Sequence, residues 1–507
     1  MIKLIDQACS LNGPAGGPSI GEMVLAVAVQ RACSPAAKCH LAAFLESCVP
    51  RVSCLPASAF TGQAFHRLAV QVNDEQLEKA QIEIARAAVR RFELATDVLA
   101  FDTTNFDTHI ATTTPGELAR RGKAKSKRSD LRVVGLAALV SETGHVPLLH
   151  RTYPGNGSDQ RVLGECLGAL GKLHQALSDA EQRPEPASRT LVRDGGSWSE
   201  QLELDLDVEG YYTLLSLPLS HGASQLALEH AARRGAMKRV GGKLGDVRAA
   251  RLRLPVGEEE LDRTLVVVES QELLRGQKRG IAVALRKAQE ELRKLERRAA
   301  SGRIQREVLE DRVQKALGRE HLSDFVIATV SEGRGKLSLD WQVDAARRRL
   351  LERTRLGRRV LCTDRHTWSN GRIAYAFRGQ WNVEELFRRA KKGGVAPWGP
   401  SHQWADSSLR LHTFATVVGL TLVSLARLAL GRRKSAQSMM KTLAEVKATL
   451  VRVRTKERGR RATVMLAPDL SAEQRKSVKT FDLGRWMPIL LSSRSADTSD
   501  SDKQPSA

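Results

Sequence analysis

Five short apolar runs between residues 97 and 217 limit the folds open to this chain more than any other feature. Each run has the length of a β-strand and ends in polar or turn-forming residues. A helical pattern over residues 160–177 separates the third run from the fourth. Strands interrupted in this way by a helix predict a mixed α/β core. The five runs cover residues 97–104, 132–140, 146–153, 188–193 and 211–217.

The segments on either side of these runs have a different character. The first 95 residues are helical in pattern, with a Ser-x-x-Glu capping box at Ser19 and an amphipathic stretch over residues 75–94. Residues 409–430 form a long apolar helix, and the end of the chain from about residue 493 has a disordered composition. We therefore predict five segments: a helical N-terminal domain, the first part of the core, an inserted subdomain, the rest of the core with C-terminal helices, and a tail, at residues 1–95, 96–220, 221–370, 371–465 and 466–507.

The predicted insertion contains a long charged helix. Its apolar positions from Ile281 to Ala299 recur in steps of three and four residues, which is the spacing of a heptad seam. Such a seam is typical either of a helical hairpin or of a short coiled coil. Strand-like and helical patterns resume after it, at residues 359–364 and 381–392.

Charge and cysteine content narrow the class of protein. The 507 residues carry a formal net charge of +23, which favours a nucleic-acid partner over an acidic membrane surface. The longest uncharged apolar run, residues 413–426, is too short to span a bilayer and is predicted to be a buried core helix, so no membrane partner is expected. The seven cysteines form no C-x-x-C pair, which indicates neither a disulfide framework nor a zinc site and is typical of a reducing cytoplasm.

Three carboxylates are candidates for chemistry. Asp102 and Asp194 each stand where an apolar strand ends, and strand ends of an open α/β sheet meet at one ligand-binding edge. Glu384, or its neighbour Glu385, lies on the amphipathic helix after the insertion. Three clustered carboxylates repel one another unless cations balance them, and two Mg²⁺ or Mn²⁺ ions would do so. Two such ions can activate an attacking oxygen and stabilise a leaving oxygen at a phosphodiester.

Taken one at a time, these residues are ordinary. A strand-end aspartate is usually a turn or cap residue, and a glutamate on a charged helix is usually solvated. Composition and spacing alone therefore predict a basic α/β protein that binds nucleic acid.

Five blocks of sequence, in order, resemble those of bacterial insertion-sequence DDE transposases. The resemblance covers residues 97–430 and includes the Tyr-Asp-Thr-Thr block, the Pro-Gly-Asn turn and the helix with a Tyr-Arg-Glu-Lys pattern. The blocks are Phe101-Asp102-Thr103-Thr104, Lys123-Ala124-Lys125-Ser126-Lys127-Arg128-Ser129-Asp130-Leu131, Tyr153-Pro154-Gly155-Asn156-Gly157-Ser158-Asp159, Val192-Arg193-Asp194-Gly195-Gly196-Ser197 and the helix from Arg378 to Lys391.

The resemblance implies an RNase H-like core, split by an insertion, that cuts DNA at the element's terminal inverted repeats and joins the freed 3′-OH to target DNA. Asp102, Asp194 and Glu384 would be the catalytic acids and would hold two Mg²⁺ or Mn²⁺ ions. The family also implies that the helical N-terminal domain, residues 1–95, binds the DNA ends. It further implies a homo-oligomer on DNA, in the nucleoid of a bacterial cytoplasm. The basic residues inside these blocks are the expected DNA contacts: Lys123, Lys125, Lys127, Arg128, Arg388, Lys391 and Lys392.

The chain departs from the family pattern at two positions. Gln380 stands at the motif's Arg position and Phe377 at its Tyr position. A guanidinium can contact a phosphate through two hydrogen bonds, which Gln cannot reproduce. Two alternatives therefore stay open: an RNase H-like nuclease that only hydrolyses, and a catalytically inactive DNA-binding descendant of a transposase.

Overall fold

A computed structural model describes most of the chain, and it divides the chain into two compact units. The first unit contains residues 1–192, 204–211 and 379–507, and the second contains residues 193–203 and 212–378. The boundaries of the second unit lie near the predicted limits of the insertion, 221 and 370. The described residues are 1–11, 16–48, 52–181, 188–241, 244–333, 336–392, 394–399, 401, 403–431, 434–447, 449–454, 461–466 and 468–487.

The first unit is built on four neighbouring strands in the order β3-β2-β1-β4. Strand β1 pairs antiparallel with β2, β2 pairs antiparallel with β3, and β1 pairs parallel with β4. Their bounds are Val98–Thr108 for β1, Arg132–Ser141 for β2, Pro147–Pro154 for β3 and Arg189–Asp194 for β4, whose last two residues belong to the second unit.

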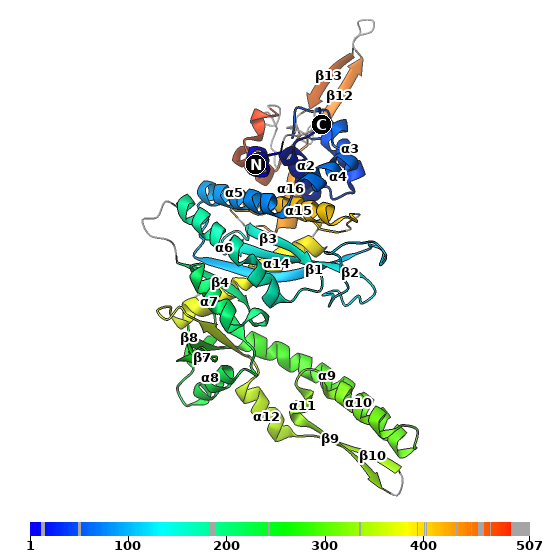
Figure 1. Ribbon diagram of the computed structural model, residues 1–507, viewed down its shortest axis with the longest axis vertical. Helices are drawn as coiled ribbons and strands as arrows, with labels where there is room; N and C mark the ends of the chain where they lie inside the picture. Colours follow the sequence, from blue (N-terminus) through cyan, green and yellow to red (C-terminus); the bar gives the residue numbers. More distant parts are fainter. Residues whose placement is uncertain are drawn as a thin grey trace, which may run out of the picture. The chain divides into compact units, whose positions relative to one another are not determined.

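Helices cover this sheet and form most of the rest of the first unit (Figure 1). Their bounds are Ile2–Cys9 (α1), Ile20–Cys33 (α2), Leu41–Glu46 (α3), Gly62–Gln71 (α4), Asp74–Phe92 (α5), Asp159–Glu181 (α6), Gln380–Lys392 (α14), Asp406–Ala429 (α15), Ala436–Ala444 (α16) and Ala472–Thr480 (α17), with the short 3-10 helices Lys38–His40, Ala57–Ala59 and Leu483–Arg485. Helix α7, Glu200–Val208, passes from the second unit into the first.

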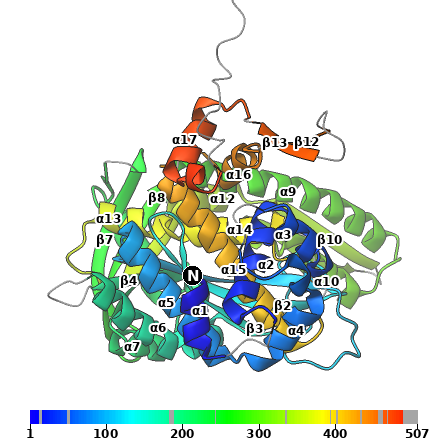
Figure 2. The same ribbon diagram turned by 90° about the horizontal axis from the view of Figure 1, so that it is seen from above.

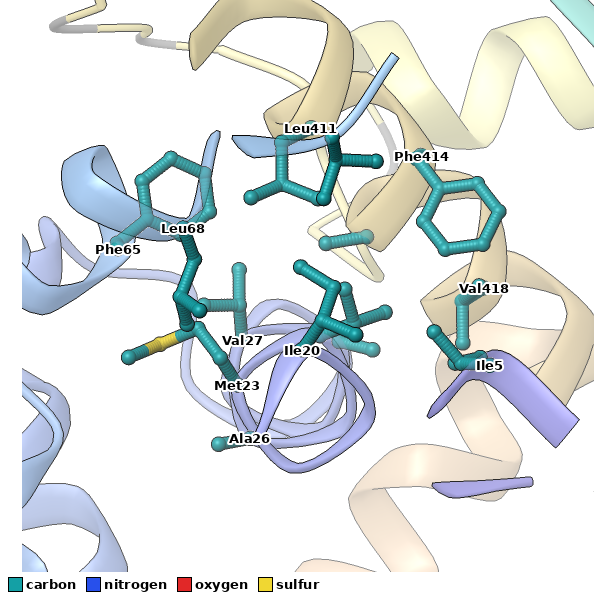
Figure 3. Close-up of a cluster of buried hydrophobic side chains, with 14 of the residues drawn as sticks. Ile5, Ile20, Met23, Ala26, Val27, Phe65, Leu68, Leu411, Phe414 and Val418 are labelled. Atoms are coloured by element: carbon teal, nitrogen blue, oxygen red, sulfur yellow. The ribbon is translucent and has the colours of Figure 1, made fainter. Parts of the chain in front are cut away.

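Helix α15 joins the N-terminal helices to the sheet. Its Leu411, Phe414 and Val418 pack with side chains of α1, α2 and α4 in one buried cluster (Figure 3). Figure 2 shows α15 beside α2. Other side chains of α15, such as Leu409 and Leu420, pack in a second cluster with the sheet strands. The helical segment that the sequence assigns to a separate domain, residues 1–95, thus shares its core with a helix near the other end of the chain.

Helix α15 is the one described helix long and apolar enough to cross a membrane, and 78% of its apolar window is buried inside the protein. This burial agrees with the prediction of a core helix over residues 413–426.

Five further strands of the nine-stranded sheet belong mainly to the second unit, in the order β5-β11-β8-β7-β6, and each neighbouring pair among them is antiparallel. Helices α8 and α13 both contact this sheet, and their buried side chains belong to different clusters. The bounds are Tyr211–Leu217 (β5), Gly222–Ala232 (α8), Lys238–Arg239 (β6), Val247–Val256 (β7), Leu261–Ser270 (β8), Arg358–Thr363 (β11) and Asn370–Arg378 (α13).

A helical pair with a two-stranded sheet completes the second unit. The long helix α9, Gln271–Ala300, buries Ile281, Leu292 and Ala299 of its heptad seam against α10 and β10. The seam is therefore satisfied within this unit, as in the helical-hairpin alternative. The remaining elements are Arg306–Leu317 (α10), Leu322–Phe325 (α11), Val326–Gly333 (β9), Lys336–Val343 (β10) and Ala345–Thr354 (α12).

The predicted mixed α/β class is confirmed, with a core that is interrupted by an α+β segment and preceded by helices, and the RNase H-like type stays a prediction. The region predicted to hold C-terminal helices contains α15 and α16 and also an antiparallel hairpin that was not predicted, β12 (Thr449–Arg454) and β13 (Arg461–Leu466). The predicted disordered end, from about residue 493, lies outside the described residues.

Candidate active site

Asp102 lies on β1, on the face of the sheet that α14 covers. Side chains alternate between the two faces of a strand, so Asp102 shares a face with Ala100 and Phe106. Both of these pack in the same buried cluster as Val383 and Phe387 of α14. Asp102 itself is half-buried and stands opposite Ala138 of β2. The first candidate acid is therefore held at the border between a packed core and solvent.

The next residue, Thr103, fixes the backbone at Asp102 through three hydrogen bonds. Its amide N–H donates to the Asp102 carboxylate over 2.7 Å, and its hydroxyl donates to Asp159 Oδ1 over 2.5 Å. Its carbonyl accepts a bond from Lys125 Nζ at 2.6 Å. Burial, with the nearby Asp159 and Asp102 charges, raises the pKa of Tyr153 to about 12, so its phenol stays protonated and donates to the Thr104 carbonyl. Asp159, expected only as a turn residue, thus helps to position the first acid.

The two candidate glutamates both lie on α14 and differ in burial. Glu385 is 8% exposed and forms ion pairs with Arg388 and with the buried Arg389, whose guanidinium also donates to Ser424. Burial lowers the pKa of Arg389, and Glu385 opposes that shift. Glu384 is exposed, and no ion pair of it is found in the described part of the chain. Glu385 therefore has a structural role, and Glu384 has a carboxylate available for a ligand.

Contacts at its two ends show that α14 runs in the same direction as β1. Near its start, Asn382 Nδ2 donates to the carbonyl of Glu142, whose own amide donates to Val98 at the beginning of β1. Near its end, Lys391 Nζ lies 5.8 Å from the ring centroid of Phe106, close to the end of β1. Asp102 and Glu384 lie between these two points, on the same face of the sheet.

Trp398 holds the far end of α14. Its backbone N–H donates to Ala390 in the last turn of the helix, and its indole ring stacks on Phe106 with centroids 4.8 Å apart. The indole N–H donates to Thr413 of α15, and the Trp398 carbonyl bonds to His412 Nε2. This single side chain therefore connects β1, α14 and α15.

Asp194 ends β4 and belongs to the second unit, along with the 3-10 turn that follows it, Gly195–Ser197. It is exposed, and its carboxylate accepts the Gly195 N–H at 2.9 Å. Ala100 of β1 and Val192 of β4 are paired in parallel register. Asp102 follows Ala100 by two residues, and Asp194 follows Val192 by two residues. Within the described ranges, no group of three or more His, Cys, Asp and Glu side chains forms a ready metal site. The joint geometry of the three acids therefore remains a prediction.

The four basic residues predicted near Asp102 lie in the loop between β1 and β2. Lys123 and Lys127 are exposed. Lys125 is bonded to β1, as described above, and Arg128 forms an ion pair with Asp130 in which its Nε donates over 2.7 Å. This loop is thus tied to β1 and presents at least two lysines to solvent.

The three basic residues predicted on the motif helix differ from one another. Arg388 is exposed and paired with Glu385, and Lys391 lies beside Phe106. Lys392 closes α14, and its side chain is outside the described part. All seven predicted DNA contacts remain predictions.

Two features of the motif helix differ from expectation. The family pattern suggests one helix, but α13 ends at Arg378 and α14 begins at Gln380, so the positions of Phe377 and Gln380 fall on different helices. Trp381, of a residue type that is mostly buried in folded proteins, is 56% exposed and contacts His145 edge-on at 5.4 Å. The break follows Arg378, whose side chain bonds within the second unit to the Leu244 carbonyl.

Comparisons with known proteins give little further support. No family model matches the sequence, and no curated protein is similar to it. Among solved structures, a piggyBac transposase synaptic complex with hairpin DNA is similar to this chain at a TM-score of 0.38 and 10% identity, over 99% of this chain and 84% of the other. A likeness at this level does not assign a family, and the resemblance to bacterial insertion-sequence transposases rests on the sequence blocks.

Proposed function

We propose that this protein is a DDE-type transposase that cleaves DNA and joins the cut end to a second DNA. The observation that carries the proposal is the placement of Asp102 and Glu384 on one sheet face, between the two anchored ends of α14. The ordered sequence blocks and the net charge of +23 support DNA as the substrate.

Asp194 completes the proposed set of acids. All donors in this set are carboxylate oxygens, which is the chemistry that Mg²⁺ and Mn²⁺ prefer, so the residues fit two such ions. When bound, the ions would polarise the phosphodiester and lower the cost of charge on the attacking and leaving oxygens. Asp102, Asp194 and Glu384 would hold and orient them, and Thr103 and Glu385 would keep two of these acids in place.

The basic loop between β1 and β2 and the exposed side of α14 are the proposed DNA contacts next to the acids. Lys123 and Lys127 would contact backbone phosphates, and their contribution would weaken as salt concentration rises. Binding of two DNA ends at once would need more than one protomer, so we propose a homo-oligomer on DNA.

The test uses purified protein, Mg²⁺ and DNA from both flanks of its gene, supplied uncut and with pre-cut 3′ ends. The proposal expects cleavage of the uncut DNA and joining of the pre-cut DNA, both lost in Glu384→Gln. Cleavage without joining would indicate a nuclease that only hydrolyses. Binding with neither reaction would indicate an inactive descendant, and either result would overturn the proposal.

A further inference from the structure

A cavity of about 440 Å³ in the second unit is lined by five arginines. Its lining residues come from the C-terminal end of α8 and the turn after it, the start of β7, the end of α12 and the start of β11. None of its described lining residues is acidic or aromatic. The five are Arg233, Arg234, Arg248, Arg353 and Arg358.

One carboxylate balances part of this charge. Glu269 of β8 accepts from Arg358 Nε at 3.1 Å and lies 3.7 Å from Arg248 Nη1. In the part of the chain that the structure describes, no ion pair involves Arg233, Arg234 or Arg353. Among the described ion pairs, one carboxylate thus offsets the charge of two of the five guanidinium groups, which leaves the pocket strongly positive.

The pocket is part of a folded frame. Arg233 and Arg234 begin a turn closed by the Ala236 N–H on the Arg233 carbonyl at 3.2 Å, and Gly235 has the positive φ of 81° that this turn requires. Met237, directly after the turn, is buried in the core of the unit. The Arg358 side chain is 9% exposed and donates to the Thr354 carbonyl at 3.2 Å. The arginines therefore project from fixed elements.

We propose that this arginine pocket binds phosphate groups, and that in the working protein these belong to the DNA backbone. A guanidinium matches a phosphate through two parallel hydrogen bonds, and several together are typical of phosphate sites. The absence of an aromatic side chain from the described lining leaves no platform for stacking a base. This favours backbone contact over binding of a free nucleotide. The choice of DNA as the source of the phosphates rests on the proposed function.

The experiment compares the full-length protein with the double variant Arg233→Gln/Arg353→Gln. The matched control is Arg303→Gln/Arg312→Gln, which removes two exposed arginines from the same unit, outside the pocket. Duplex DNA binding is measured by fluorescence anisotropy over a series of salt concentrations. Each lost phosphate contact makes the negative slope of log K against log salt shallower by about 0.9. The slope of the pocket variant should therefore be shallower than that of the wild type by about 1.8. All substituted side chains are exposed, so the melting temperatures should be unchanged.

A slope for the pocket variant equal to that of the control would overturn the proposal. A second arm adds ATP and inorganic tripolyphosphate to each protein without DNA. One outcome is that either anion raises the melting temperature of the wild type and the control but not of the pocket variant, while DNA affinity is the same in both variants. The pocket would then bind a free anion, and the assignment to DNA would be wrong.

The outcome is separable from that of the proposed function. A shallower salt slope for the pocket variant, in a protein that never cleaves DNA, would support the phosphate-binding pocket and overturn the proposed transposase activity. The opposite outcome is cleavage and joining that depend on Glu384, together with equal DNA binding by the pocket and control variants. It would support the transposase activity and overturn phosphate binding by the pocket.

Discussion

At the scale of single residues, the structure separates neighbours that the sequence leaves equivalent. Glu384 and Glu385 both fit the acid of the motif, and only burial distinguishes them. A helix turns by about 100° per residue, so two adjacent side chains point in different directions. One meets Arg389 in the core, and the other meets solvent.

Glu385→Gln should destabilise the protein by about 3 kcal/mol, because it leaves the buried Arg389 without a countercharge. Glu384→Gln should leave the stability within about 0.5 kcal/mol of wild type, as is usual for an exposed position. Urea unfolding of the two variants measures the difference. Equal stabilities would show that Glu385 is not the structural member of the pair.

Thr103→Val should cost about 2 kcal/mol, because the hydroxyl of the buried Thr103 donates to the charged carboxylate of Asp159. Thr103→Ser should recover most of this loss. Thr108→Val is a matched control on the same strand, where the hydroxyl donates to the neutral carbonyl of Arg132, and it should cost about 1 kcal/mol. Urea unfolding of the three variants tests the ranking, and an equal cost for both Val substitutions would contradict it.

At the scale of elements, most strands and helices could be predicted, because their signals are local. Apolar runs bounded by turns gave β1 to β5, and helical periodicity gave α5, α9, α14 and α15. The β9–β10 and β12–β13 hairpins were missed, since exposed strands lack the apolar run on which the prediction depends. The break at Gly379 was missed because the motif pattern continues across it. Contacts between distant segments, such as that of Trp398 with Phe106, leave no local signal.

Trp398→Ala should loosen the end of α14. The change removes the stack on Phe106 and the bond to Thr413, and replacing a buried Trp with Ala costs about 3–5 kcal/mol. Hydrogen exchange should become faster for the last turns of α14 than for α5, whose Leu77, Ala80 and Ile84 pack in a different buried cluster from Trp398. Trp398→Phe keeps an aromatic ring and should restore most of the protection. Equal acceleration in both helices would mean that Trp398 stabilises the unit only globally.

His150 of β3 should make the free energy of unfolding of the first unit depend on pH. Burial lowers the pKa of this imidazole to about 3, and its Nδ1 has no partner within the described structure. Between pH 6.5 and pH 3 the unfolded chain therefore binds a proton that the folded chain does not. His150 should thus reduce the free energy of unfolding by about 1.4 kcal/mol for each pH unit over this window as the pH falls.

His150→Leu should remove this contribution, whereas the exposed His109→Leu should not. Urea unfolding at pH 6.5, 5.5 and 4.5 measures the slope for each protein. Parallel slopes for the wild type and His150→Leu would contradict the depressed pKa.

At the scale of the whole molecule, the positive charge is distributed over both units. Basic residues follow β1 and line α14 in the first unit, and five arginines line a cavity in the second. The sequence proposes all three acids, because each stands in a recognisable block, and their joint role stays a prediction. It could not show that Asp102 and Glu384 share a sheet face, since that depends on the packing of α14.

The central claim is that Asp102, Asp194 and Glu384 together form a metal-dependent site for DNA strand transfer. The most direct measurement is the joining of pre-cut ends, taken from the DNA that flanks the gene, to a plasmid target in Mg²⁺. We expect joined product with the wild type and a loss of at least about 100-fold with Glu384→Gln, because a removed ligand weakens metal binding and charge stabilisation together. A Glu384→Gln protein that folds, binds DNA and joins the ends at the wild-type rate would contradict the account.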